Sequence, residues 1–137
     1  MKALTLLILR VSLGWLMVVW GVDKLVDVEG AQRLAENFYW GLATGAGIQT
    51  VFGWLEIALG ILVVVGWMAR VTWPIMTLVN GLTLLGVWAS VVDPWGFWLE
   101  RGGSMTFYTS AIVFAGVLVG WAFMDQDKIS VDRRRER

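Results

Sequence analysis

The sequence predicts an all-α integral membrane protein, in which a single domain over residues 1–137 folds as a four-helix bundle. Composition is the first reason: AVILMFWYC residues make up 58% of the chain and charged residues only 16%. Soluble domains are about 45–50% apolar even when glycine is counted. The second reason is the presence of four nearly uncharged runs of roughly 20 residues, the length that crosses a hydrocarbon core.

The predicted transmembrane helices cover residues 3–22, 50–69, 72–92 and 105–124. Their only charged residues are Arg10 and Glu56. The first run resembles a signal peptide in its position, but Arg10 interrupts the apolar stretch and no small-residue cleavage site follows. We therefore expect this run to remain as a membrane anchor.

Basic residues in the flanks predict the orientation. One side carries Lys2, Arg70, Lys128, Arg133, Arg134, Arg135 and Arg137, and the other carries Lys24, Arg33 and Arg101. Because cytoplasmic flanks hold the excess of Lys and Arg, we expect both termini in the cytoplasm of a multi-pass protein of the prokaryotic plasma membrane. Residues 125–137 then form a cytoplasmic tail whose basic cluster anchors the topology, with contact to anionic lipid as the alternative.

The two external connections carry features of their own. Residues 28–39 (VEGAQRLAENFY) repeat apolar side chains at helical spacing, which predicts a short helix at the membrane interface. The second connection contains Trp95, Phe97 and Trp98 beside charged residues. Aromatic side chains favour the headgroup region, so we expect an aromatic belt. The alternative is a lid over an outward-facing cavity.

Composition also excludes several functions. The formal charge is zero, so there is no net basic field for nucleic acid. The chain has no Cys and no His, which removes thiol chemistry and makes a metal centre held by this chain alone unexpected. Any redox centre should belong to a partner protein or a diffusible molecule.

Small residues indicate where helices approach closely, because helix association in lipid depends on close packing. Gly14 and Gly21 share one face of the first helix, and Gly53 and Gly60 share one face of the second. We assign packing roles to Gly14, Gly21, Gly60 and Gly66. The Gly116-x-x-x-Gly120 spacing is a weaker indication of a contact within the chain or between subunits, so a homo-oligomer remains open.

The charged residues of the first two helices should face each other, since charges in hydrocarbon usually point into a bundle. Arg10 and Glu56 lie about 10 Å apart in depth, and their side chains lean in opposite directions toward their own helix N-termini. Lys24 leans back into the membrane toward Glu56, so we expect the Lys24–Glu56 pair. For Arg10 the expectation is snorkelling to the inner headgroups, with Asn80 of the third helix as the alternative partner.

Hydroxyl groups on the last helix lie at the same expected depth. Tyr108, Thr109 and Ser110 fall in the outer half with Glu56, where they complete a polar pocket near Trp20 and Trp54 or simply bond to neighbouring helices. The candidates for ligand binding or proton transfer are Lys24, Glu56, Arg10, Asn80 and Tyr108. For Lys24 and Glu56, a functional role and a structural ion pair stay equally open.

These residues carry a resemblance to a known family. The patterns R10-x3-G14-x6-G21-x2-K24 and E56-x3-G60-x5-G66-x3-R70 resemble the DoxX family of small four-helix membrane proteins, over about residues 4–92. The resemblance implies association with membrane oxidoreductase systems, including the DoxD and DoxA type thiosulfate:quinone oxidoreductase. The architecture is also similar to that of MauE and DsbB-like proteins, but those need cysteine pairs, so dithiol oxidation is excluded.

Two functions from different classes follow as hypotheses. The first is a redox subunit that binds quinone non-covalently in its outer half and works with redox partner proteins. The second is a non-enzymatic scaffold that recruits soluble redox enzymes to the lipid bilayer. Transport of a small solute is a third possibility, since buried charges also mark permeation paths, although four helices form only a narrow conduit.

Overall fold

The computed structural model describes residues 1–38, 40–99 and 105–135, and within these ranges the chain is helical with no strand. In chain order the helices are α1 (Lys2–Val26), α2 (Val28–Phe38), α3 (Ala46–Val65), α4 (Ala69–Gly86), α5 (Trp88–Val92), α6 (Met105–Ala122), the short 3-10 helix η1 (Met124–Gln126) and α7 (Val131–Arg135). The all-α prediction is confirmed.

The expectation of four transmembrane helices is not confirmed in that form. Among the described residues two helices, α1 and α3, are long and apolar enough to cross a membrane. The predicted third span is divided at Val87 into α4 and α5, directly after Gly86, a residue that weakens helices. Arg70 and Asn80 lower the hydropathy of α4, and α6 is apolar over Thr106–Ala122.

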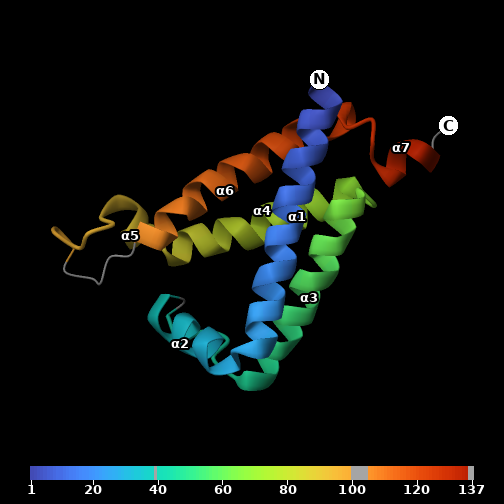
Figure 1. The fold of residues 1–137 in the computed structure, drawn as a ribbon. Helices are drawn as coiled ribbons and strands as arrows, with labels where there is room; N and C mark the ends of the chain where they lie inside the picture. Colours follow the sequence, from blue (N-terminus) through green and yellow to red (C-terminus); the bar gives the residue numbers. More distant parts are fainter. Residues whose placement is uncertain (39, 100–104, 136–137) are drawn as a thin grey trace.

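The long helices are arranged as two pairs. Figure 1 shows α1 and α3 side by side, and α4 and α6 side by side, with the second pair crossing the first at a large angle. The pairs converge where α1 begins, α3 ends and α6 ends, and they diverge toward α2 and α5. The start of α1 and helix α7 thus lie at one end of the molecule, which we call the terminal end.

Glycines set the contact between α1 and α3. A Cβ atom on Gly14 would lie 2.8 Å from the carbonyl oxygen of Gly60, and one on Gly21 would lie 2.5 Å from that of Gly53. The reverse substitutions on α3 meet the α1 carbonyls just as closely, at 2.6 and 2.8 Å. Gly14, Gly21 and Gly60 therefore lie in a contact where only glycine lets the two backbones touch.

The core lies where the two pairs cross. It takes side chains from all four long helices: Leu13, Met17, Leu59, Val63, Trp73, Met76 and Val117. A Cβ atom on Gly120 would collide with the Trp73 ring, so the glycine of α6 serves a contact within the chain. Only 22% of the most apolar window of α1 and 28% of that of α3 are buried. Such exposed apolar helices suit lipid rather than water.

The connection between α1 and α3 contains the predicted short helix, now seen as α2. The Asp27 carboxylate caps it by accepting a 2.9 Å hydrogen bond from the Gly30 N–H. Gln32 ties it to the following loop through a 2.6 Å hydrogen bond to the Thr44 carbonyl. At its other end, the Phe38 ring meets Phe107 of α6 edge-on at 4.8 Å. Residue 39, the last of the predicted segment, is outside the described residues.

The second connection is organised by one carboxylate. Asp93 is 1% exposed and accepts hydrogen bonds from the backbone N–H groups of Phe97, Trp98 and Leu99 at 2.6–3.0 Å. Burial opposes its ionisation, but these N–H groups outweigh burial and lower the pKa of Asp93 below its usual range. The loop therefore holds exposed aromatic side chains on a fixed backbone, with Trp95 stacked on Phe97 at 6.2 Å.

Candidate functional site

Lys24 and Glu56 form an ion pair between α1 and α3, as the sequence predicts. The distance from Lys24 Nζ to Glu56 Oε2 is 2.8 Å. Helices α1 and α3 are antiparallel, and Gly21 faces Gly53. Lys24 therefore lies one turn closer to the C-terminus of α1, and Glu56 one turn closer to the C-terminus of α3, which separates their Cα atoms by about 9 Å along the helix axes. The two side chains close this gap by leaning toward each other, each toward the N-terminus of its own helix.

The pair is shielded but not sealed. The side chain of Lys24 is 26% exposed and that of Glu56 is 13% exposed. Among the described residues, the Lys24 ammonium donates one hydrogen bond and Glu56 accepts it on one oxygen only. Two N–H groups of Lys24 can thus donate hydrogen bonds to another molecule, and the second carboxylate oxygen of Glu56 can accept one.

Arg10 lies at the opposite end of α1 and behaves differently from the prediction. Its side chain is 4% exposed, and its Nη1 donates a 2.7 Å hydrogen bond to Asp127 Oδ2 in a buried ion pair. Nη2 donates a 3.4 Å hydrogen bond to the Ile129 carbonyl, and Nε is buried without a hydrogen-bond partner among the described residues. Snorkelling to the headgroups is therefore wrong for Arg10, because the returning C-terminal segment supplies a carboxylate.

Asn80 is not the partner of Arg10 either. Its side-chain amide donates to the Met76 carbonyl of its own helix at 2.9 Å and contacts the sulfur of Met17 at 3.7 Å. Asn80 is 3% exposed and lies where α1 crosses α4. Its amide is satisfied locally, in the manner of polar side chains inside apolar cores.

Tyr108 and Thr109 of α6 form no hydrogen bond with the ion pair among the described residues. Tyr108 is 49% exposed, and no hydrogen bond joins it to Lys24 or Glu56 in the described part of the chain. Thr109 donates to the Thr106 carbonyl of its own helix at 2.8 Å. Trp54 is 62% exposed, on the outer surface of α3. Tyr108 and Thr109 thus add no described hydrogen bond to the ion pair, and the choice between a polar pocket and purely structural hydroxyls stays a prediction.

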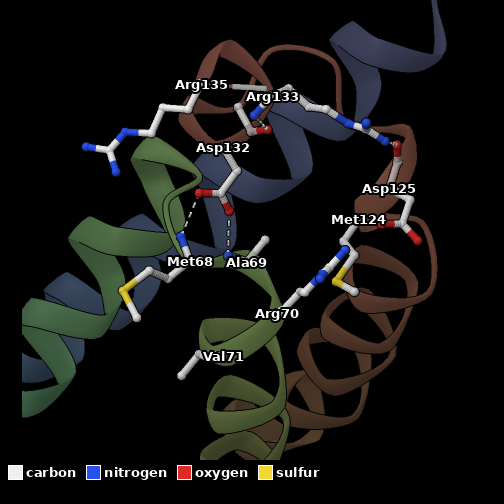
Figure 2. A pocket seen from close by; sticks show the side chains of 10 residues that line it. Met68, Ala69, Arg70, Val71, Met124, Asp125, Asp132, Arg133 and Arg135 are labelled. Carbon is white, nitrogen blue, oxygen red and sulfur yellow. Dashed lines mark hydrogen bonds between the residues drawn. The ribbon is translucent and has the colours of Figure 1, made fainter. Parts of the chain in front are cut away.

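The C-terminal segment is a structural element of the terminal end and not a free tail. Asp132 accepts hydrogen bonds from the Met68 and Ala69 N–H groups at 3.0 and 2.7 Å, and so caps α4, as Figure 2 shows. Its own N–H donates to the Gly66 carbonyl at 3.2 Å. Together with Arg10–Asp127, this cap forms what we call the C-terminal latch.

Gly66 has a packing role, but at this latch. It adopts a left-handed conformation with φ of 71° and ends α3, while the Trp67 N–H bonds back to the Leu62 carbonyl at 3.0 Å. A Cβ atom here would collide with Arg10 Nη1 and would lie 2.7 Å from the Cβ of Ser130. The sequence did not reveal Asp127 and Asp132 as partners, since acidic residues mixed with basic ones are also typical of a solvated tail.

A cavity of about 380 Å³ lies beside the latch. Arg70, Met124, Asp125, Asp132 and Arg133 are among its lining residues. In Figure 2, Arg70 points toward Met124 and Asp125, and Arg133 extends across to Asp125, whose carbonyl accepts its hydrogen bond. Figure 2 also shows Arg135 turned away from this group; its guanidinium lies 5.3 Å from the centre of the Trp67 ring.

A sequence model of the family described as DoxX matches residues 5–92. The matched region contains the Lys24–Glu56 pair and the four glycines of the α1–α3 contact. It ends before α6 and the C-terminal latch. No curated protein and no solved structure matches the chain.

Proposed function

The chain belongs to the DoxX family of membrane proteins, and from this premise we propose that it is a quinone-linked subunit of a membrane oxidoreductase system. The observation that carries the proposal is the partly exposed Lys24–Glu56 pair on the two helices that can cross a membrane. Ionisable groups in such helices are costly and mark ligand or proton pathways by default.

We propose that α4 with α5, and α6, cross the bilayer beside α1 and α3, with both termini in the cytoplasm of a prokaryotic cell. The distribution of basic residues supports this arrangement, since Arg70, Lys128 and Arg133–Arg135 belong to segments of the terminal end. Lys24 and Arg33 belong to α1 and α2 at the opposite end. The Lys24–Glu56 pair then lies in the outer half of the membrane.

The two side chains fit the head group of a quinone by their chemistry. A bound quinone would take up two electrons and two protons. Lys24 has N–H groups free of other described partners and can donate one to a head-group oxygen. Glu56 can hold a proton at its carboxylate and release it within hydrogen-bond reach of the same oxygen. The Coulomb attraction of Lys24 keeps that carboxylate in place between proton transfers.

The electrons have to come from a partner protein in this proposal. The chain has neither Cys nor His, the usual ligands of iron–sulfur, haem and copper centres. A redox partner on either membrane face would therefore deliver electrons, and this subunit would bind and protonate the quinone.

The experiment is quinone retention by protein purified gently from membranes and measured by mass spectrometry. The wild type should carry quinone, and the variant Lys24→Met with Glu56→Gln should lose it while remaining folded, since no charge is left unpaired. The exposed pair Glu29–Arg33, 3.9 Å apart, provides the control with Glu29→Gln and Arg33→Met. Equal quinone in all three proteins would contradict the proposal.

The outer loop favours a second candidate, a scaffold for soluble redox enzymes. Trp95, Phe97 and Trp98 are 61%, 74% and 76% exposed on a backbone fixed by Asp93. Exposed aromatic side chains on a rigid loop are typical anchors of protein interfaces. If this function holds, partner proteins should co-purify with the wild type without quinone and be lost in Trp98→Ala. Unchanged partners in this variant would contradict it.

A further inference from the structure

We propose that the cavity beside the C-terminal latch binds the phosphodiester head group of an anionic phospholipid in the leaflet nearest the chain termini. The cavity lies between the first turn of α4, η1 and α7. This inference does not depend on the quinone role, because the cavity is lined by residues of the C-terminal latch and the start of α4, whereas Lys24 lies in the last turn of α1.

The position of the cavity suits a lipid head group. Met68 and Val71 line it and are 46% and 47% exposed, so apolar surface continues from the helices to the cavity edge. The charged lining comes from Arg70 and from the returning C-terminal segment. An apolar wall that meets a basic rim matches the boundary between acyl chains and phosphates in a bilayer.

The charge of the lining favours an anion. Three arginines and two aspartates line the cavity. Arg135 is turned away toward Trp67, so Arg70 and Arg133 are the arginines that lie toward Asp125 in Figure 2. Both oxygens of Asp132 accept hydrogen bonds from the backbone at the start of α4, so this carboxylate is already occupied. Asp127, another carboxylate of the segment, is bound to Arg10. In the described part of the chain Arg70 forms no ion pair, although Asp125 lies beside it.

The volume of the cavity and the positions of its arginines indicate which kind of anion would fit. A volume of about 380 Å³ falls at the small end of known ligand pockets, which suits a head group better than a whole lipid. Arginine guanidinium groups bind phosphate oxygens through two parallel N–H donors. Arg70 approaches from α4 and Arg133 from α7, so a phosphate between them would connect two segments that are far apart in sequence.

The test is a lipid titration of the full-length protein in mild detergent, followed by intact-complex mass spectrometry. Phosphatidylglycerol should bind in preference to phosphatidylcholine with the same acyl chains. Arg70→Gln should weaken phosphatidylglycerol binding about fivefold, the factor expected for one basic residue near a lipid surface. The control Arg33→Gln removes an exposed arginine of α2 and should leave the preference unchanged.

Inorganic phosphate separates the two sources of the anion. If the site takes a lipid, millimolar phosphate should leave phosphatidylglycerol bound; if phosphate displaces the lipid, the occupant is a free anion and the proposal is wrong. Unfolding temperature shows whether Arg70→Gln remains folded, and Arg133→Gln replaces it if it does not. Equal binding of both lipids by the wild type, or an unchanged preference in the folded variant, would also overturn the proposal.

Discussion

Helix α1 carries two cations that form ion pairs, Arg10 in its first half and Lys24 in its last turn, and the two have different surroundings. Arg10 and Asp127 have side chains 4% and 10% exposed, and the pair connects α1 to a segment more than a hundred residues away in the chain. Lys24 and Glu56 are 26% and 13% exposed and connect neighbouring helices. A sealed pair can only hold structure together, whereas an accessible pair can exchange protons or contact a ligand.

The largest effect should come from breaking the sealed pair. Asp127→Ala leaves the Arg10 guanidinium buried without a partner, which costs on the order of 3–5 kcal/mol. We expect a large fall in unfolding temperature in detergent and early cleavage near residue 129 by a protease. Asp125→Ala, which removes an exposed carboxylate two residues away, is the control. Similar stability of the two variants would show that Arg10 does not need Asp127.

The accessible pair should be less sensitive. Glu56→Gln leaves Lys24 unpaired, but water or lipid head groups can reach its ammonium, so we expect a loss of about 1–3 kcal/mol. The variant Lys24→Met with Glu56→Gln should recover most of that loss. The coupling energy of the full cycle, measured by denaturation, should be roughly 0.5–3 kcal/mol. Additive single effects would mean that the two charges do not interact.

These two pairs also show what the sequence could and could not predict. Helical spacing and side-chain lean are local properties, so they predicted the glycine contact of α1 with α3 and the Lys24–Glu56 pair. Arg10 and Asp127 are brought together by the path of the whole chain, which no local pattern specifies. The prediction for Arg10 failed because Asp127 and Asp132 look like solvated charges in a basic tail.

The shifted start of the third predicted span, α4, has a similar explanation. Hydropathy identified the apolar run 72–92, but the helix start at Ala69 depends on the capping carboxylate of Asp132, which comes from the other end of the chain. The end of α3 was also placed too late, since Gly66 takes the left-handed conformation that closes the helix. Helix existence was therefore predictable, and boundaries that rest on distant residues were not.

A moderate effect should follow from removing the cap at the latch. Asp132→Ala takes away the acceptor of two backbone N–H groups at the start of α4, and helix caps contribute about 0.5–2 kcal/mol. Hydrogen exchange at the amides of Met68 and Ala69 should become faster, while exchange in the middle of α3 stays slow. Asp132→Asn keeps an acceptor oxygen and should show a smaller change. Unchanged exchange in the alanine variant would exclude the cap.

The smallest effect is expected in the loop that Asp93 organises, which follows α5. The pKa of Asp93 is lowered, so its ionised form stabilises the loop above its unfolded pKa of about 3.9, and this contribution is lost as the pH falls through the folded value. Fluorine signals of labelled Trp95 and Trp98 should broaden on acidification. Asp93→Asn should remove this pH dependence. A response that persists in the asparagine variant would point to another acidic group.

The most direct test of the account compares the two pairs in a single measurement of bound quinone per folded protein. Both pairs are replaced by neutral residues, as Lys24→Met with Glu56→Gln in one variant and Arg10→Met with Asp127→Asn in the other. The account predicts that the first variant folds and loses quinone. The second variant should give less folded protein, but the folded fraction should retain quinone. Retention by the first variant, or loss only from the second, would contradict the assignment of the accessible pair as the functional site.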